Sequence, residues 1–369
     1  MIWLFVLLVT IVPSFLISYF TVALVRVAAQ RFGLMDKPGY RKIHVTPIPL
    51  GGGLGIWAGL AGTFALGTVA VFLGNSLFEP QGPLSAFAIY LPGLRDKVSE
   101  IWVLLMGATI LMILGLADDR TGLPWQLRLL VELLVAAGIV YWQGLQLTAF
   151  IDLPWLTGLL SVLWIVALIN SFNMLDNMDG LSGGVAAISA AMLAAMLMLQ
   201  PDPMTRQPQL FVAALLLVLV GSLMGFLTHN WPPASIFMGD AGSYLVGYWI
   251  AIATLLTTYT GYQGATSHAI IAPLCVLAIP LYDMCSVIWI RLREGRSPFE
   301  GDKRHFSHRL VELGLSKKSA VLTIYLATFT CGLGAILLNR TDIVGAALVV
   351  LLVAAVLGLI AILENRPST

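Results

Sequence analysis

The sequence predicts an all-α fold, a polytopic integral membrane helix bundle with about eleven transmembrane helices, and three observations carry this prediction. Of the 369 residues, 59% are apolar and 11% are charged, whereas soluble domains average about 45–50% apolar and about 25% charged residues. The apolar residues fall into runs of roughly 20, the length that spans a bilayer as a helix. Lys and Arg gather in alternate connections between these runs. The composition therefore excludes a soluble globular protein.

Each expected helix is an apolar run bounded by charged or turn-forming residues. The expected helices cover residues 3–25, 51–74, 100–117, 125–143, 155–172, 181–199, 209–227, 242–258, 268–290, 319–338 and 342–363. The first run has no Lys or Arg before it and is followed by Arg26 and Arg31. It is therefore expected to be a retained anchor with its N-terminus outside. The Pro- and Gly-containing segment 75–98 is expected to form an outer loop.

The distribution of positive charge tests this topology, because cytoplasmic connections carry an excess of Lys and Arg. With the N-terminus outside, the inner connections hold 16 of the 20 Lys and Arg residues and the outer ones hold 4. Adding or removing one middle helix would spoil this bias, so the C-terminus is expected to be cytoplasmic. We expect a single transmembrane catalytic domain over residues 1–369. Its active site is expected in cytoplasmic loops near residues 26–50, 118–124, 173–180, 228–241 and 291–318.

Acidic residues gather on the same inner face. Seven of the twelve aspartates lie at or near cytoplasmic helix ends: Asp36, Asp118, Asp119, Asp176, Asp179, Asp240 and Asp283. Each one alone could be a helix cap. Because an ionised carboxylate near hydrocarbon costs a few kcal/mol, the set as a whole favours bound cations, a metal or a water-filled cavity.

The segment from Asn173 to Asp179 is the most informative of these. Asn173, Asp176 and Asp179 recur at every third residue, which on a helical backbone places them on neighbouring positions of one face. No Lys or Arg lies nearby in the sequence. The pattern favours ligands for a hard cation or for the donor groups of a nucleotide. A solvated turn between two helices is the alternative.

The segment Gly239-Asp240-Ala241-Gly242 opens the eighth expected helix. Its glycines would let a ligand approach the backbone, and free N–H groups at a helix start favour phosphate. Asp240 could hold a metal against that phosphate, since magnesium takes one or two protein carboxylates together with phosphate and water oxygens. An ordinary N-cap aspartate is the alternative.

Two further segments suggest phosphate chemistry. The adjacent acids Asp118 and Asp119 could supply a base, a metal ligand or both, and Arg128 after them could hold a phosphate. In the basic inner loop from Arg291 to Lys318, phosphate binding is a better explanation of the histidines than zinc, because no cysteine completes a zinc site. A positive-inside anchor or contact with anionic lipid explains the loop's charge equally well.

Four ordered motifs resemble those of the polyprenyl-phosphate N-acetylhexosamine-1-phosphate transferases, a family of the glycosyltransferase family 4 type. They are Asp118-Asp119, the run from Asn173 to Leu181, the run from Phe237 to Ser243, and His305-Phe306-Ser307-His308. The resemblance covers residues from about 33 to 318. It implies transfer of N-acetylhexosamine-1-phosphate from a UDP-sugar to polyprenyl phosphate, commonly undecaprenyl phosphate in bacteria, with release of UMP. The implied setting is the bacterial inner membrane, in the first membrane step of a cell-envelope glycan pathway.

The resemblance also implies roles for particular residues. Asp240 and Asn173 match the positions that bind magnesium, for which manganese is an expected substitute. Asp118 and Asp119 match the catalytic acid pair near the lipid phosphate. The positions that match the nucleotide-sugar site are Asp176, Asp179, Lys37 and His44. Those that match phosphate-binding positions are Arg128, His305, His308 and Arg309.

The last loop departs from the family pattern. Members that transfer N-acetylglucosamine phosphate often carry His-x-His-His there, and Ser307 replaces the middle histidine in this chain. The chain fits the UDP-N-acetylglucosamine:undecaprenyl-phosphate branch best, and the sugar stays open. The lipid bilayer is an expected partner, nucleic acid is not, and a homodimer is left open.

Two other classes are alternatives. A secondary transporter using the cytoplasmic-side aspartates would need polar groups near the bilayer midplane and repeated halves, and no repeat is visible. An intramembrane aspartyl protease would use two acids, Asp240 and Asp283, without explaining the histidines.

Overall fold

The computed structural model describes residues 2–36, 47–73, 88, 90–147, 153–199, 209–261, 271–301, 304–338 and 340–364. In this part of the chain there are 13 helices and one two-stranded sheet. The helices are α1 (Ile2–Ala28), α2 (Gly52–Leu73), α4 (Leu91–Thr121), α5 (Trp125–Gln143), α6 (Pro154–Leu175), α7 (Leu181–Leu199), α8 (Leu210–Asn230), α9 (Gly239–Gly261), α10 (Ala272–Val276), α11 (Ala278–Arg293), α12 (Phe306–Glu312), α13 (Lys317–Leu338) and α14 (Ile343–Glu364). Among the described residues, 9 helices are long and apolar enough to cross a membrane. The expected polytopic helical fold is confirmed at this level.

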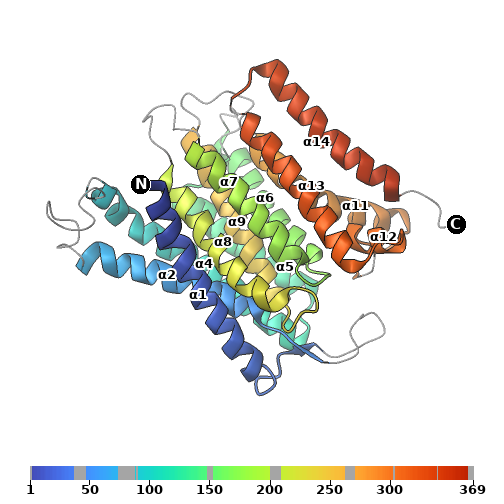
Figure 1. Cartoon of the computed structure of the whole chain (residues 1–369), viewed down its shortest axis with the longest axis horizontal. Coiled ribbons are helices and arrows are strands. Elements are labelled where there is room, and N and C mark those ends of the chain that lie inside the picture. The colour runs from blue at the N-terminus through green and yellow to red at the C-terminus, as the bar shows by residue number, and fades with distance from the viewer. Residues whose placement is uncertain are drawn as a thin grey trace.

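Helix α9 is the centre of the bundle. It packs against α2, α4, α6, α7 and α8, and Figure 1 shows it behind α7 and α8. Two of its aromatic side chains, Tyr248 and Trp249, are buried, and their polar tips bond to carbonyls of neighbouring helices. The Tyr248 hydroxyl donates to the Leu104 carbonyl at 3.1 Å, and Trp249 Nε1 donates to the Leu215 carbonyl at 3.1 Å. Helix α9 is therefore surrounded by other helices of the bundle, and their packing holds it in position.

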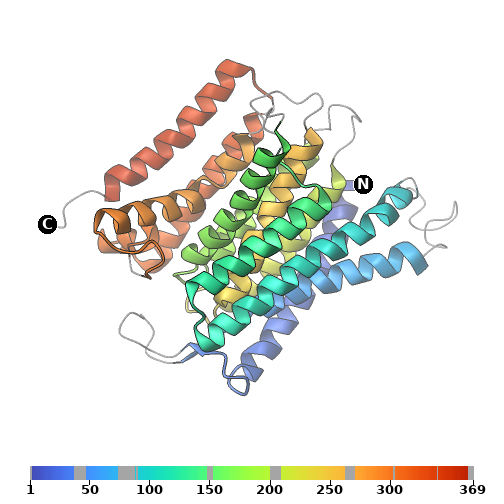
Figure 2. The same ribbon diagram turned by 180° about the vertical axis from the view of Figure 1, so that it is seen from behind.

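The outer helices present apolar side chains outward, as lipid-facing helices do. On α1, Leu24 is 71% exposed, and on α14 Ile343 is 75% exposed. Figure 1 shows α14 at the outer edge of the bundle beside α13, and Figure 2 shows α4, α5 and α6 across the opposite face. The chain is thus a multi-pass membrane protein.

The helix expected over residues 268–290 is interrupted. The described part of this segment forms α10 and α11, which are separated at Leu277. Pro280 explains the break, because a proline has no N–H and its ring displaces the carbonyl four residues earlier, here that of Val276.

Helix α4 begins at Leu91, nine residues before the expected position 100. The added residues 91–99 include polar side chains, so they were not recognised as part of an apolar run. Their contacts stabilise the extra turns of the helix. The Arg95 guanidinium donates to the Val71 carbonyl in the last turns of α2 at 3.2 Å, and Lys97 pairs with Glu100. At its other end α4 continues through Asp118 and Asp119 to Thr121, so both acids lie on its last turn.

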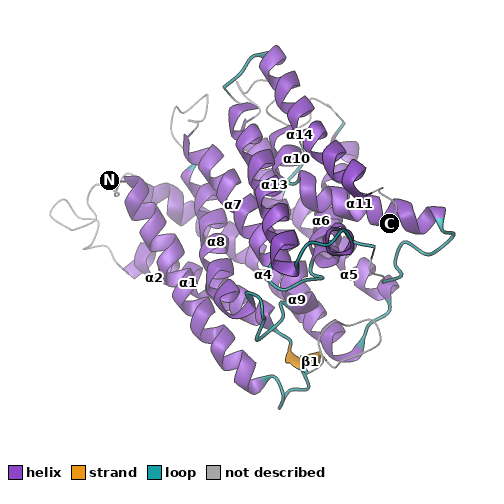
Figure 3. Cartoon of the chain, turned by 45° about the vertical axis from the view of Figure 1, so that its right-hand side comes forward, coloured by secondary structure: helices purple, strands orange, loops and turns teal. Residues whose placement is uncertain are grey.

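A short sheet lies at the end of the bundle where α9 begins. β1 (Met35–Asp36) pairs antiparallel with β2 (Ile48–Pro49), and Figure 3 shows β1 at that end of the molecule. The backbone N–H of Phe237 donates to the Pro49 carbonyl at 2.9 Å, and the N–H of Gly52 donates to the Phe237 carbonyl at 2.9 Å. These bonds fix the backbone that leads directly into α9. The small sheet is an addition to the expected all-α fold.

Two glycines let α2 and α4 approach the start of α9 at backbone distance. A Cβ at Gly53 would stand 2.3 Å from the Gly242 nitrogen, and a Cβ at Gly115 would stand 2.3 Å from the Ala241 nitrogen. Both obstacles are backbone atoms, which cannot rotate aside. The three helix ends therefore meet only because these positions have no side chain.

Gly115→Ala is expected to lower the stability of the protein by about 1–3 kcal/mol, the usual cost of overpacking, and to reduce activity by moving α4 away from α9. Gly138→Ala on α5 is the matched control, because no atom lies within 4 Å of its added Cβ. Thermal unfolding of both variants in detergent measures the difference. Equal unfolding temperatures for the two variants would contradict this packing.

Candidate active site

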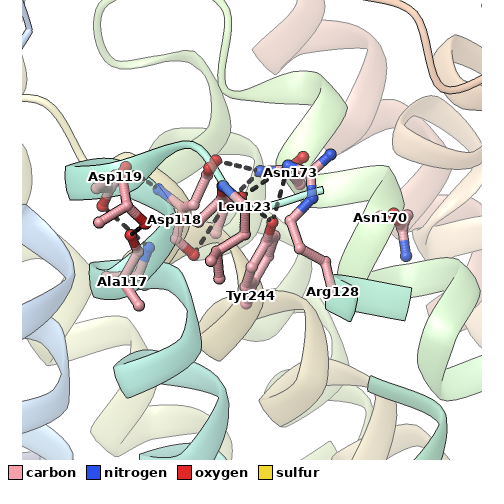
Figure 4. A network of polar contacts seen from close by, with 12 residues as sticks. Ala117, Asp118, Asp119, Leu123, Arg128, Asn170, Asn173 and Tyr244 are labelled. Atoms are coloured by element: carbon pink, nitrogen blue, oxygen red, sulfur yellow. Dashed lines mark hydrogen bonds and ion pairs between the residues drawn. The ribbon is translucent and has the colours of Figure 1, made fainter. Parts of the chain in front are cut away.

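The ends of α4 and α6 and the beginning of α9 bring polar side chains together at one end of the bundle. Figure 4 shows Asp118, Asp119, Asn173, Tyr244 and Arg128 in this cluster. They come from four helices: α4 contributes the two aspartates, α5 Arg128, α6 Asn173 and α9 Tyr244. The acid pair, the Asn173 segment and the start of α9, which the sequence marked separately, thus form one site.

Asp118 is a buried carboxylate held by three donors. Arg128 Nη1 contacts Asp118 Oδ2 at 2.7 Å, and the Tyr244 hydroxyl donates to the same oxygen at 3.0 Å. The backbone N–H of Leu123 donates to Asp118 Oδ1 at 2.7 Å. The Asp118 side chain is 4% exposed and that of Arg128 is 27% exposed. Asp118 is therefore neutralised by the arginine, whose side chain remains partly exposed.

Asp119 caps α9 from a different helix. Its two carboxylate oxygens accept the backbone N–H groups of Asp240 at 2.9 Å and Ala241 at 3.3 Å. Gly239 has φ +72°, and a Cβ there would stand 2.4 Å from Asp119 Oδ2. Only glycine fits at this position, because both the left-handed backbone and the close carboxylate disfavour a side chain.

Because Asp119 caps α9, the Asp240 side chain is not needed as a cap. Asp240 lies in the first turn of α9 rather than at its N-cap, so its carboxylate is turned to α6. Asn173 Nδ2 donates to Asp240 Oδ1 at 2.7 Å and to the Ser243 hydroxyl at 3.0 Å. The two residues expected to bind magnesium therefore lie in direct contact.

The turn after α6 carries two further acids. Burial raises the pKa of the Asp176 carboxyl to about 7, and the negative charges of Asp119 and Asp179 act in the same direction. Asp179 Oδ2 accepts the backbone N–H of Ala234 at 3.0 Å, which joins this turn to the segment before α9. A cation bound among these acids would favour the ionised form of Asp176.

The donor set fits a magnesium ion that completes its coordination with substrate. In the described part of the chain, no group of three or more His, Cys, Asp and Glu side chains could hold a metal. Magnesium in phosphate chemistry uses one or two carboxylates together with phosphate oxygens and water. Asp240, with the Asn173 amide beside it, can supply such a partial set.

The histidine loop is anchored on α11. His305 is 6% exposed, and its Nδ1 lies 2.9 Å from Asp283 Oδ2. Arg309 Nη2 donates to the Ser286 hydroxyl at 2.9 Å, and the ring centroids of His305 and His308 are 6.4 Å apart. The structure thus places His305, His308 and Arg309 together. Lys37 and His44 lie outside the described residues.

The Ser307 side chain reaches the turn that carries Asp176 and Asp179. Its hydroxyl donates to Asn177 Oδ1 at 2.5 Å, and Ser307 is 1% exposed. The residue that replaces the middle histidine of the family pattern is therefore a buried link between α12 and the site.

Three contributions were not found from the sequence. Tyr244 was missed although it lies four residues after Asp240, a spacing that places both on one helix face. The partly buried bond from Asn170 Nδ2 to Glu132 Oε2, at 2.6 Å, lies one turn from Asn173 and Arg128. Asp283 was counted among the inner acids, but no spacing signal links it to His305.

The fold and site define a multi-pass membrane protein with a carboxylate-rich polar site at one end of its helix bundle. Comparison with known proteins narrows this class. Residues 101–258, which run from within α4 to within α9, match the model of glycosyl transferase family 4.

Curated bacterial proteins match over most of the chain. A probable undecaprenyl-phosphate N-acetylglucosaminyl 1-phosphate transferase of Bacillus subtilis is 32% identical over 348 residues, which are 91% of this chain and 87% of the relative. A decaprenyl-phosphate N-acetylglucosaminephosphotransferase of Mycobacterium tuberculosis is 33% identical over 95% of this chain and 87% of its own. An undecaprenyl-phosphate alpha-N-acetylglucosaminyl 1-phosphate transferase of Salmonella typhi is 30% identical, with 86% and 80% covered. The chain belongs to the family of polyprenyl-phosphate N-acetylhexosamine-1-phosphate transferases, of the glycosyl transferase family 4 type.

Proposed function

We propose that this protein transfers N-acetylglucosamine-1-phosphate from UDP-N-acetylglucosamine to a polyprenyl phosphate, undecaprenyl phosphate in the first instance, and releases UMP. The observation that carries the proposal is the meeting of Asp118, Asp119, Asn173 and Asp240 beside Arg128 at one end of a membrane bundle. The names of the relatives, which specify undecaprenyl and decaprenyl phosphate, support the acceptor.

In the proposed reaction an oxygen of the lipid phosphate attacks the β-phosphorus of the UDP-sugar. A new phosphorus–oxygen bond joins the lipid to the sugar phosphate, and the bond from the β-phosphorus to the bridging oxygen breaks. The departing UMP keeps that oxygen and its electron pair. A phosphate monoester has its second pKa near 6 and is largely ionised at neutral pH, so the acid pair need not act as a strong base.

The protein's own residues would then position the charged groups. The Arg128 guanidinium has five N–H donors, so it can hold Asp118 and a phosphate at the same time. Asp240 and Asn173 would hold Mg²⁺, for which Mn²⁺ is a substitute, while Asp176 and Asp179 would line the nucleotide-sugar site. When bound, Mg²⁺ offsets negative charge on the diphosphate and so favours the transfer.

The proposed topology has eleven spans, an outside N-terminus and a cytoplasmic active site in the bacterial inner membrane. Its support is the gathering of 16 of 20 Lys and Arg residues in the inner connections. UDP-sugars are soluble anions, which suits a site at the membrane surface better than one at the midplane.

The structure disfavours both rival classes. A transporter would need its polar groups at the middle of the bundle, whereas the acid cluster lies at helix ends. For a protease, Asp240 and Asp283 should act as a pair. Instead, Asp240 bonds with Asn173, and both oxygens of Asp283 bond with residues 305–306.

The assay for this proposal incubates the purified protein with UDP-N-acetylglucosamine, radiolabelled in the sugar, and undecaprenyl phosphate. We expect label in the butanol phase and release of an equal amount of UMP when Mg²⁺ is present. Chelation by EDTA should abolish both products, and added Mg²⁺ or Mn²⁺ should restore them. No lipid product with any UDP-amino sugar would contradict the proposal and favour transport.

A further inference from the structure

We propose that Asp283 is a positioning residue that acts through His305 to present the imidazole ring to the diphosphate of the UDP-sugar. This inference rests on the proposed function. Asp283 lies on α11 and is 0% exposed, so it cannot reach a substrate itself. Its carboxylate is nevertheless fully engaged by the first residues of the histidine loop.

The two oxygens of Asp283 hold two consecutive residues. Asp283 Oδ2 lies 2.9 Å from His305 Nδ1, and Asp283 Oδ1 accepts the backbone N–H of Phe306 at 2.6 Å. The first contact orients the ring and the second fixes the backbone that carries it. A histidine whose Nδ1 is held by a carboxylate directs its Nε2 away from that carboxylate.

A second hydrogen bond also attaches α12 to α11. Ser286 lies three residues after Asp283, on the same face of the helix, and accepts a bond from Arg309 Nη2 at 2.9 Å. Helix α12 is therefore attached at its beginning and one turn later. Both attachments involve residues that the family resemblance leads us to expect at the phosphates, His305 and Arg309.

The opposite side of α12 reaches the acid-rich turn. Ser307 donates to Asn177 Oδ1 at 2.5 Å, and Asn177 stands between Asp176 and Asp179 in the sequence. His305 is thus held by Asp283 of α11. Two residues later, Ser307 contacts the turn of the proposed nucleotide-sugar site. The contact of Asp283 with the His305 ring would not be needed if Asp283 only capped a helix or bound a metal. It is explained if Asp283 orients the ring.

A double-mutant cycle between Asp283 and His305 tests the proposal. Asp283→Asn keeps the shape and an oxygen for the Phe306 N–H, but it removes the charge beside His305. We expect it to lower kcat/KM for UDP-N-acetylglucosamine by about 10- to 100-fold, as loss of an orienting partner does elsewhere. The loss should lie mainly in a higher KM for the UDP-sugar, with the KM for undecaprenyl phosphate unchanged. In a His305→Gln background, the same substitution should change kcat/KM by less than about twofold.

Asp342→Asn is the matched control, because Asp342 Oδ1 accepts the Gly345 N–H at 2.9 Å in an exposed first turn of α14. It should leave all kinetic constants unchanged. If Asp283→Asn does not fold, as judged by thermal unfolding, Asp283→Glu replaces it in the same cycle. It keeps the charge but moves both oxygens.

Multiplicative losses in the double mutant, or no loss in Asp283→Asn, would overturn the positioning role while leaving the proposed function intact. An inactive wild-type protein would instead contradict the proposed function itself. The two failures are therefore distinguishable in one set of measurements.

Discussion

Asp240→Ala is expected to abolish magnesium-dependent release of UMP, with kcat/KM lower by about 10³-fold, because the several kcal/mol that a metal contributes to phosphoryl transfer would be lost. Asp240 lies in the first turn of α9 and does not cap that helix. Asp119 caps the helix in its place, and the Asp240 carboxylate contacts Asn173. Initial rates of UMP release at increasing Mg²⁺ concentration measure the effect.

Asp240→Asn separates charge from shape at this position. It keeps the side-chain volume and should be nearly as inactive as the alanine variant, while its thermal unfolding should match the wild type more closely. Asp96→Asn at the other, exposed end of α4 is the control and should remain fully active. Near-normal turnover of Asp240→Ala would contradict the metal assignment.

Arg128→Ala is expected to lower both activity and stability. Removing Arg128 leaves the buried Asp118 carboxylate with only the neutral donors of Tyr244 and Leu123, at a cost of up to about 3 kcal/mol. The phosphate contact proposed for the guanidinium would also be lost, so kcat/KM should fall by about 100-fold, within the range of a lost charge-stabilising donor. Arg128→Lys should recover part of the stability but little of the activity, because a lysine cannot hold a carboxylate and a phosphate with the same fork geometry.

A second substitution distinguishes the two effects of Arg128. Asp118→Asn added to Arg128→Ala removes the stranded charge and should restore much of the thermal stability. It should not restore transfer activity. Recovery of activity in the double variant would show that Arg128 only neutralises Asp118 and does not act on substrate.

The sequence predicted best those features that depend on a single continuous segment. Apolar runs located the helices, since α5 and α7 begin and end where the runs do. The spacing of Asn173, Asp176 and Asp179 predicted one helical face, but α6 ends at Leu175, so both aspartates lie in the turn that follows it. Family resemblance then connected this segment with the acid pair and with the start of α9.

Contacts between segments that are distant in the sequence could not be predicted from it. Nothing in the run Gly239-Asp240 shows that Asp119, from another helix, caps α9 and frees the Asp240 carboxylate. The distance between Asp283 and His305 likewise depends on how α11 and α12 pack. The break at Leu277 was in principle foreseeable, because Pro280 lies within the expected helix. The early start of α4 was less so, because its first turns are polar.

The position of the transferred phosphorus tests the central claim most directly. UDP-N-acetylglucosamine labelled with ³²P at the β-phosphate is incubated with the purified protein, undecaprenyl phosphate and Mg²⁺, and the phases are separated. The account predicts that the ³²P enters the butanol phase together with the sugar and that the nucleotide left in water is unlabelled UMP. Sugar in the lipid phase with the ³²P retained in water as UDP would contradict it, because the enzyme would then transfer the sugar without its phosphate.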